Sequence, residues 1–80
     1  MLRAKITVTL KESIFDPQGK ATENTLKEMG FPVGTVRIGK FIEVSLVEKD
    51  KEKAEKIVQE ISDQLLANPV IEDYSFELEG

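Results

Sequence analysis

The segment from Val36 to Leu46 constrains the fold of this chain most, because it combines β-branched residues, an internal glycine and two cationic side chains. Alternation of apolar and polar residues is typical of a strand with one buried face. Here five aliphatic residues are even-numbered, whereas four polar ones are odd-numbered: Val36, Ile38, Ile42, Val44 and Leu46 against Thr35, Arg37, Glu43 and Ser45. The segment therefore predicts extended structure whose even-numbered side chains lie in the core.

Gly39 leaves two interpretations of this segment open. A two-residue turn at Gly39-Lys40 is disfavoured, because it would place Val36 opposite Glu43 and mix the two faces. A three-residue loop over residues 38–40 would instead pair Val36 with Ile42. Alternatively, the segment is one long strand kinked at Gly39, since glycine commonly marks a bulge or a bend.

The N-terminal part of the chain predicts a strand followed by a helix. Strict alternation from Arg3 to Glu12 is typical of a half-buried strand. Asp16-Pro17 then suits a helix N-cap and first helical position, and Gly30 suits a left-handed end to that helix. The residues spaced to form its inward stripe are Ala21, Thr25, Leu26 and Met29.

The C-terminal part predicts a second helix and a final strand. Asp50 is the expected N-cap, and Asn68-Pro69 ends the helix because proline drives the preceding residue out of the α region. The inward positions follow the helical repeat: Ala54, Ile57, Val58, Ile61 and Leu65. If Leu65 is buried as its spacing predicts, its truncation to Ala costs about 2–5 kcal/mol. Apolar residues between Val70 and Leu78 indicate the last strand.

These elements predict a single domain over residues 1–80 of the α+β class. Two strand-then-helix units and a final strand indicate a ferredoxin-like βαββαβ antiparallel sheet with two helices on one face. If the middle segment is one kinked strand, the second and third strands merge. The other face suits a contact between subunits, because it mixes apolar and polar residues: Thr7, Thr9, Arg37, Phe41, Ser45, Ile71 and Ser75.

Composition excludes several classes of function. The chain has no Cys and no His, which removes disulfides, zinc ligation and the common nucleophile and base pairs. Its net charge of −4 opposes binding to nucleic acid. Without a signal peptide or an apolar run of membrane-spanning length, we expect a cytoplasmic protein that does not enter membranes.

Three motifs occur in order along the chain: Asp16-Pro17-Gln18-Gly19, Val36-Arg37-Ile38-Gly39-Lys40 and Leu65-Leu66-Ala67-Asn68-Pro69-Val70-Ile71-Glu72. Together they closely resemble the PurS family, the small subunit of phosphoribosylformylglycinamidine (FGAM) synthase. The resemblance covers essentially the whole chain. It implies a required but non-catalytic subunit of a glutamine amidotransferase-type ligase in de novo purine biosynthesis.

The resemblance also implies partners. The small subunit bridges a glutaminase subunit and a large synthetase subunit, and two copies of it take part, as a homo-oligomer that is a dimer or a tetramer. The synthetase uses ATP and Mg, whereas the small subunit binds no cofactor and no metal. Whether the small subunit also aids ammonia transfer between the two partners is left open.

Within the matched motifs we divide the residues by side-chain chemistry, and we expect no catalytic residue. Directional polar contacts make one group the predicted partner interface: Arg37, Lys40, Asn68 and Glu72. Backbone conformation or helix capping makes the other group a structural motif: Asp16, Pro17, Gly19, Gly39 and Pro69. An exposed cation on a strand rim is also a common solubility device, so the interface assignment rests on the resemblance.

Two other classes of function compete with this one. The main alternative is a stand-alone regulatory domain that binds a small metabolite at a subunit interface, which predicts a saturable ligand effect without a large partner. The other is an enzyme that acts alone, which the lack of any nucleophile and base constellation disfavours.

Overall fold

The computed structural model describes all residues from 1 to 80. The elements follow one another as β1 (Leu2–Leu10), α1 (Pro17–Glu28), β2 (Lys40–Leu46), α2 (Lys51–Ile61), the π-helical turn η1 (Ser62–Leu66) and β3 (Glu72–Glu79). The three strands form one sheet in the order β2-β1-β3, and both pairings are antiparallel. No helix has the length and apolar character needed to cross a membrane.

The core lies between the central strand β1 and helix α2. The alternation predicted for β1 is confirmed, because Ala4, Ile6 and Val8 are fully buried. Ile6 pairs with Ile42 of β2 on one side and with Phe76 of β3 on the other. Four further residues complete the buried apolar cluster: Leu46, Ala54, Val58 and Ala67. The two chain ends meet at one end of this sheet, where Arg3 pairs with Glu79.

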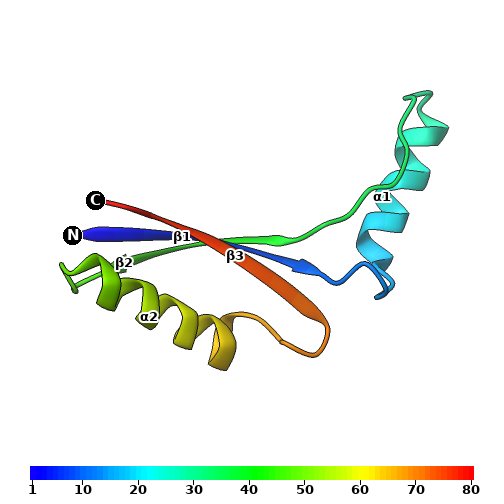
Figure 1. Ribbon diagram of the computed structural model, residues 1–80. Coiled ribbons are helices and arrows are strands. Elements are labelled where there is room, and N and C mark those ends of the chain that lie inside the picture. Colours follow the sequence, from blue (N-terminus) through cyan, green and yellow to red (C-terminus); the bar gives the residue numbers. More distant parts are fainter.

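Helix α1 projects away from the sheet (Figure 1). Strands β1 and β2 are antiparallel neighbours, with Val8 opposite Lys40, so the connection that contains α1 leaves and re-enters the sheet at the same end. The Cα radius of gyration is 15.9 Å, whereas a compact chain of this length has about 12 Å. We call residues 17–35 the arm. Two segments join the arm to the sheet, residues 11–16 and 36–39, and together we call them the neck.

The predicted α+β class, with an antiparallel ferredoxin-like sheet and two helices, is confirmed, but two details differ. Only α2 covers the sheet, because the geometry of the β1–β2 connection carries α1 beyond its end. The sheet also has three strands rather than four, because no hairpin forms around Gly39. Residues 36–39 lead directly into β2, which begins at Lys40, so the interpretation of one strand kinked at Gly39 is closer than a hairpin, although pairing stops at Gly39.

Gly39 has a packing reason to be glycine. A Cβ atom at this position would lie 2.5 Å from the carbonyl oxygen of Val8 and 3.0 Å from Cγ2 of Thr9. Real Cβ atoms essentially never approach this closely, so any side chain would force β1 and β2 apart. Gly39 therefore permits the segments that continue β1 and precede β2 to stay close together where they leave the sheet.

The predicted ends of α1 are confirmed, but its predicted inward stripe is wrong. Asp16 caps the helix, Pro17 is its first residue, and Gly30 has a φ of 90°. Because α1 has no sheet beneath it, Met29 is 65% exposed, and Ala21 and Thr25 are exposed as well. Leu26 is half-buried.

The end of α2 corrects the prediction for Leu65, which is 82% exposed rather than buried. The helix widens into η1, where the amide of Ala67 donates to the carbonyl of Ser62 across five residues. A π-helical turn holds more residues than an α-helical turn, so the inward position moves on by one residue. Leu66 accordingly packs against the core.

Candidate functional site

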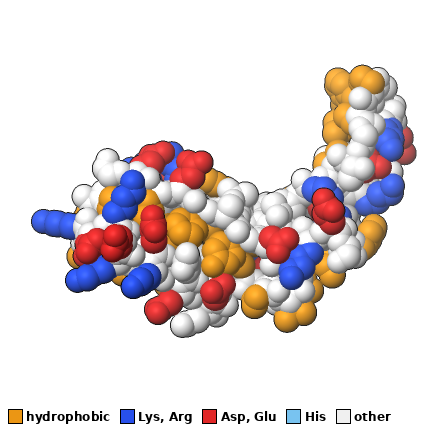
Figure 2. All heavy atoms as spheres, viewed as in Figure 1, with side chains coloured by type: hydrophobic (Ala, Val, Ile, Leu, Met, Phe, Trp, Pro, Cys, Tyr) orange, Lys and Arg blue, Asp and Glu red, His pale blue; other side chains and the backbone are white.

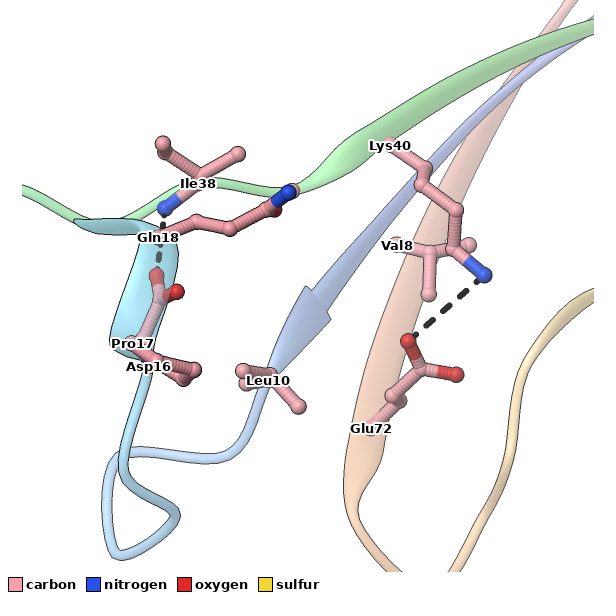
Figure 3. A pocket seen from close by; sticks show the side chains of 9 residues that line it. Val8, Leu10, Asp16, Pro17, Gln18, Ile38, Lys40 and Glu72 are labelled. Carbon is pink, nitrogen blue, oxygen red and sulfur yellow. Dashed lines mark hydrogen bonds and ion pairs between the residues drawn. The ribbon is translucent and has the colours of Figure 1, made fainter. Parts of the chain in front are cut away.

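The two segments of the neck are held together by hydrogen bonds. Nη2 of Arg37 donates to the carbonyl oxygens of Lys11 and Ile14, each at 3.0 Å. The amide of Ile38 donates to Oδ2 of Asp16 at 2.7 Å, as Figure 3 shows. Because α1 leaves the sheet altogether, these bonds and the chain itself determine the direction of the arm.

Asp16 serves both the helix and the neck. Its Oδ1 accepts the Gly19 amide at 2.9 Å, while its Oδ2 accepts the Ile38 amide. These two hydrogen bonds, to Gly19 first and then to Ile38, lower the pKa of the Asp16 carboxyl group. The side chain therefore stays ionised and holds both backbone groups at neutral pH. The predicted cap is confirmed, and the bond to the neck is an additional role.

Glu23 binds the segment that runs back from the end of α1 to β2, residues 31–39, which we call the return chain. Its Oε2 is 3.0 Å from Nζ of Lys27 and 3.2 Å from Nζ of Lys20, and its Oε1 accepts the amide of Val36 at 3.1 Å. Only 6% of the residue is exposed. Sequence reasoning missed Glu23, although lysines three residues before it and four residues after it are a signal for an ion-paired carboxylate.

Gly19 lets the return chain approach α1 closely. A Cβ atom there would clash with the carbonyl oxygen of Val36 and lie 2.6 Å from Oδ2 of Asp16. The glycine is fully enclosed between these two groups, so the predicted backbone role of Gly19 has a definite cause. It makes room for the bonds by which Asp16 and Glu23 hold the neck and arm.

Below the neck lies a hollow of about 280 Å³ at the end of the sheet (Figure 3). Nζ of Lys40 points across it toward Oε2 of Glu72, 3.7 Å away. Oε1 of Glu72 in turn accepts the amide of Asn68 at 2.7 Å. Lys40 and Glu72 therefore each have a partner within this chain. The lining residues are Val8, Leu10, Asp16, Pro17, Gln18, Ile38, Gly39, Lys40 and Glu72.

The four residues of the predicted partner interface do not form one group. Lys40 and Glu72 lie together at the hollow, and the amide of Asn68 binds Glu72. The guanidinium group of Arg37 instead binds the opposite segment of the neck. Asn68 also accepts the amide of Val70 at 3.0 Å, which shapes the turn that contains Pro69. Their roles in binding a partner stay a prediction.

Two surfaces of the chain lack a covering layer. The sheet face opposite α2 is open, and its neutral residues are exposed: Thr7, Thr9, Phe41, Ser45 and Ser75. The second surface is α1, and Figure 2 shows hydrophobic side chains gathered at the tip of the arm. Met29 and Phe31, which is 51% exposed, lie at this tip. A contact between subunits was predicted for the open face, and the tip of the arm is a second candidate surface, which is apolar.

The Glu23 contacts predict loosening of the arm in acid. Hydrogen bonds from Lys27 and from the Val36 amide lower the pKa of Glu23 from 4.5 to about 2. A carboxyl group with a lowered pKa stabilises the folded state above its unfolded pKa, and this contribution is lost as the pH falls through the folded one. We therefore expect protection of the Val36 amide from hydrogen exchange to decrease between pH 4.5 and pH 2.

NMR can follow this acid transition at the carboxyl carbon of Glu23 and at the amide of Val36. Glu28 is an exposed carboxylate on the same helix and makes no ion pair, so Glu28→Gln is the matched control for Glu23→Gln. The Glu23 variant should lose the transition and the control should keep it. A Glu23 carboxyl that titrates near 4.5 in the folded chain would contradict the assignment.

Comparison with known proteins identifies the family. The model of the PurS family, described as phosphoribosylformylglycinamidine (FGAM) synthase, matches residues 3–80. The chain is 44% identical to the FGAM synthase subunit PurS of Bacillus subtilis, over 99% of this chain and 94% of that one.

Solved structures agree in both sequence and fold. PurS of Methanocaldococcus jannaschii, one of the subunits of formylglycinamide ribonucleotide amidotransferase in the purine biosynthetic pathway, is 35% identical with a TM-score of 0.88, over 99% of this chain and 96% of that one. A chain in the structure of PurLQS from Thermotoga maritima is 34% identical with a TM-score of 0.88, over 99% of each chain. With the family model and the identities spanning nearly its whole length, this chain belongs to the PurS family.

Proposed function

We propose that this chain is the non-catalytic small subunit of an FGAM synthase in purine biosynthesis, and that it bridges the glutaminase and synthetase subunits. The observation that carries the proposal is the likeness to a chain of the PurLQS structure over 99% of the length of both. The proposal includes a cytoplasmic location, and it assigns ATP and Mg to the synthetase.

The shape of the chain supports a role in assembly. Its apolar core contains seven buried residues, and an isolated domain of this size is marginally stable. One face of the sheet remains uncovered, and so do the apolar side chains of Met29 and Phe31 at the tip of the arm. Contiguous apolar surface on a small domain marks sites of protein association. We therefore infer that the chain works as a homo-oligomer in contact with larger subunits.

Reconstitution from separate subunits tests the proposed function. The glutaminase and synthetase should form FGAM from glutamine and ATP only when this chain is added. Ammonium chloride supplied in place of glutamine should restore product formation by the synthetase without it, because ammonia then reaches the synthetase from solution. Full glutamine-dependent activity without this chain would contradict the proposal.

The residues predicted to face inward on α1 lie at its surface instead, and we call them the α1 stripe: Ala21, Thr25, Leu26 and Met29. This stripe predicts a specific effect on self-association. Met29→Lys places a charge on the exposed apolar side of the helix, where burial of the methionine contributes about 1.5–3 kcal/mol if a second copy covers it. The dissociation constant of the oligomer should rise about tenfold or more. Size-exclusion chromatography with light scattering over a range of concentrations measures the change.

Asn24→Lys is the matched control, because it adds the same charge to α1 on a different side of the helix. A lysine at position 29 also suits the C-terminal end of the helix dipole, so the substitution does not disfavour α1 itself. Equal dissociation by both variants would contradict a contact through the stripe.

A further inference from the structure

We propose that Arg37 is a positioning residue that fixes the direction of the arm, rather than a residue whose charge binds a partner directly. This inference rests on the proposed function, because it concerns how the arm is presented to the other subunits. Arg37 lies in the neck, where its side chain joins the two segments that leave the sheet side by side.

The geometry of Arg37 is that of an internal brace. One guanidinium nitrogen lies 3.0 Å from the carbonyl oxygens of Lys11 and Ile14, which both belong to the other segment of the neck, residues 11–16. The Lys11 carbonyl also accepts the amide of Ile14 at 2.9 Å, so Arg37 binds both ends of the turn that follows β1. These two bonds span 26 and 23 residues of sequence and so join the two segments of the neck.

Two carboxylates extend the brace on the arm side. Asp16 holds the amide of Ile38, and Glu23 holds the amide of Val36, so the residues on either side of Arg37 are both fixed. The return chain therefore cannot slide along α1 without breaking these bonds. The arm and its return chain behave as one rigid unit, and Arg37 ties that unit to the end of β1.

A brace matters here because the arm has no packing against its own sheet. If the arm swings freely, the orientation that fits a partner is populated only part of the time. Apparent affinity then falls by the fraction of competent molecules, so an arm that is correctly oriented about one tenth of the time binds about tenfold more weakly. Preorganisation is the benefit that Arg37 supplies.

The arm direction can be measured directly, because the chain has no Cys. Two exposed positions outside any ion pair, Glu28 on α1 and Lys56 on α2, can be changed to Cys and spin-labelled. Pulsed electron resonance, with excess unlabelled chain to dilute the labels, then gives the distance distribution between α1 and α2. We expect Arg37→Ala to broaden this distribution and to weaken capture of the glutaminase and synthetase by about tenfold.

Arg3→Ala is the matched control, because Arg3 is exposed, pairs with Glu43 at 3.9 Å and lies at the far end of the sheet. It should leave both measurements unchanged. Arg37→Lys keeps the charge but loses the length and planar shape of the guanidinium group, so it should behave like Arg37→Ala. Unfolding of the sheet, followed at the amide of Ile6, should not change in the Arg37 variants.

Several outcomes would overturn the inference. Recovery of partner capture by Arg37→Lys would indicate a direct charge contact, and so would weaker capture with an unchanged distance distribution. A loss of sheet stability in Arg37→Ala equal to the loss of capture would indicate a purely structural role. Failure of the unsubstituted chain to capture either subunit would instead refute the proposed function, while the distance distribution would still test the brace.

Discussion

Replacing Ile6 by Ala is expected to lower the free energy of unfolding by about 2–5 kcal/mol, the range for truncation of buried Ile, Leu or Met side chains. Ile6 is fully buried at the centre of β1, and its neighbours across the sheet are Ile42 and Phe76. The surrounding core has few residues, so collapse around the cavity is limited. Since small domains have about 5–15 kcal/mol in total, the variant should be close to unfolding.

Denaturation with urea measures this loss as a lower midpoint at an unchanged slope. Leu65→Ala is the informative control, because it removes a similar side chain that is 82% exposed, and its effect should stay within about 0.5 kcal/mol. The helical spacing of Leu65 predicts the opposite result. Equal losses at Ile6 and Leu65 in the isolated chain would mean that η1 does not have the described π-helical register.

Replacing Gly39 by Ala is expected to destabilise the chain by about 1–3 kcal/mol, the usual range for overpacking. The added Cβ would lie 2.5 Å from the carbonyl oxygen of Val8. Both atoms belong to the backbone or are fixed to it, so no side-chain rotation can relieve the contact. The neck end of β2 must therefore move away from β1, which also disturbs Lys40, the next residue, and Arg37, two residues before Gly39.

Gly34→Ala is the control for Gly39→Ala. No atom lies within 4 Å of a Cβ built at Gly34, and its φ is not positive. The change should be neutral or stabilising by about 0.4–1 kcal/mol, because it restricts the unfolded chain. Thermal unfolding compares the two variants, and hydrogen exchange at Val8 and Lys40 locates the disturbance. Similar stability of both variants would show that β1 and β2 can move apart at Gly39 without a loss of stability.

The parts of the fold that follow from local sequence could be predicted. Alternation along β1 reports which side chains face the core, and Asp16 and Asp50 cap their helices through bonds within three residues. The place of α1 could not be predicted in this way. It depends on the pairing of Val8 with Lys40, residues far apart in sequence, which puts both ends of the connection at one end of the sheet.

The candidate site was predicted in part for the same reason. Asp16, Gly19 and Gly39 stood out because a motif or a turn residue marks them locally. Glu23 has a local signal in its two lysines, but its bond to the backbone of Val36, 13 residues away, has none. Sequence also offers no signal that Arg37 binds two carbonyl groups, because every backbone carbonyl is chemically equivalent until the fold brings one near.

The strand order has a consequence for how the protein is made. The central strand is the first to be synthesised, but one of its two neighbours, β3, is the last, so that Arg3 must wait for Glu79. While the chain is still on the ribosome, the edge of β1 that later binds β3 has no partner. Unpaired strand edges invite pairing with other chains. Until β3 is made, this edge of β1 is therefore the part of the sheet most open to pairing with another chain.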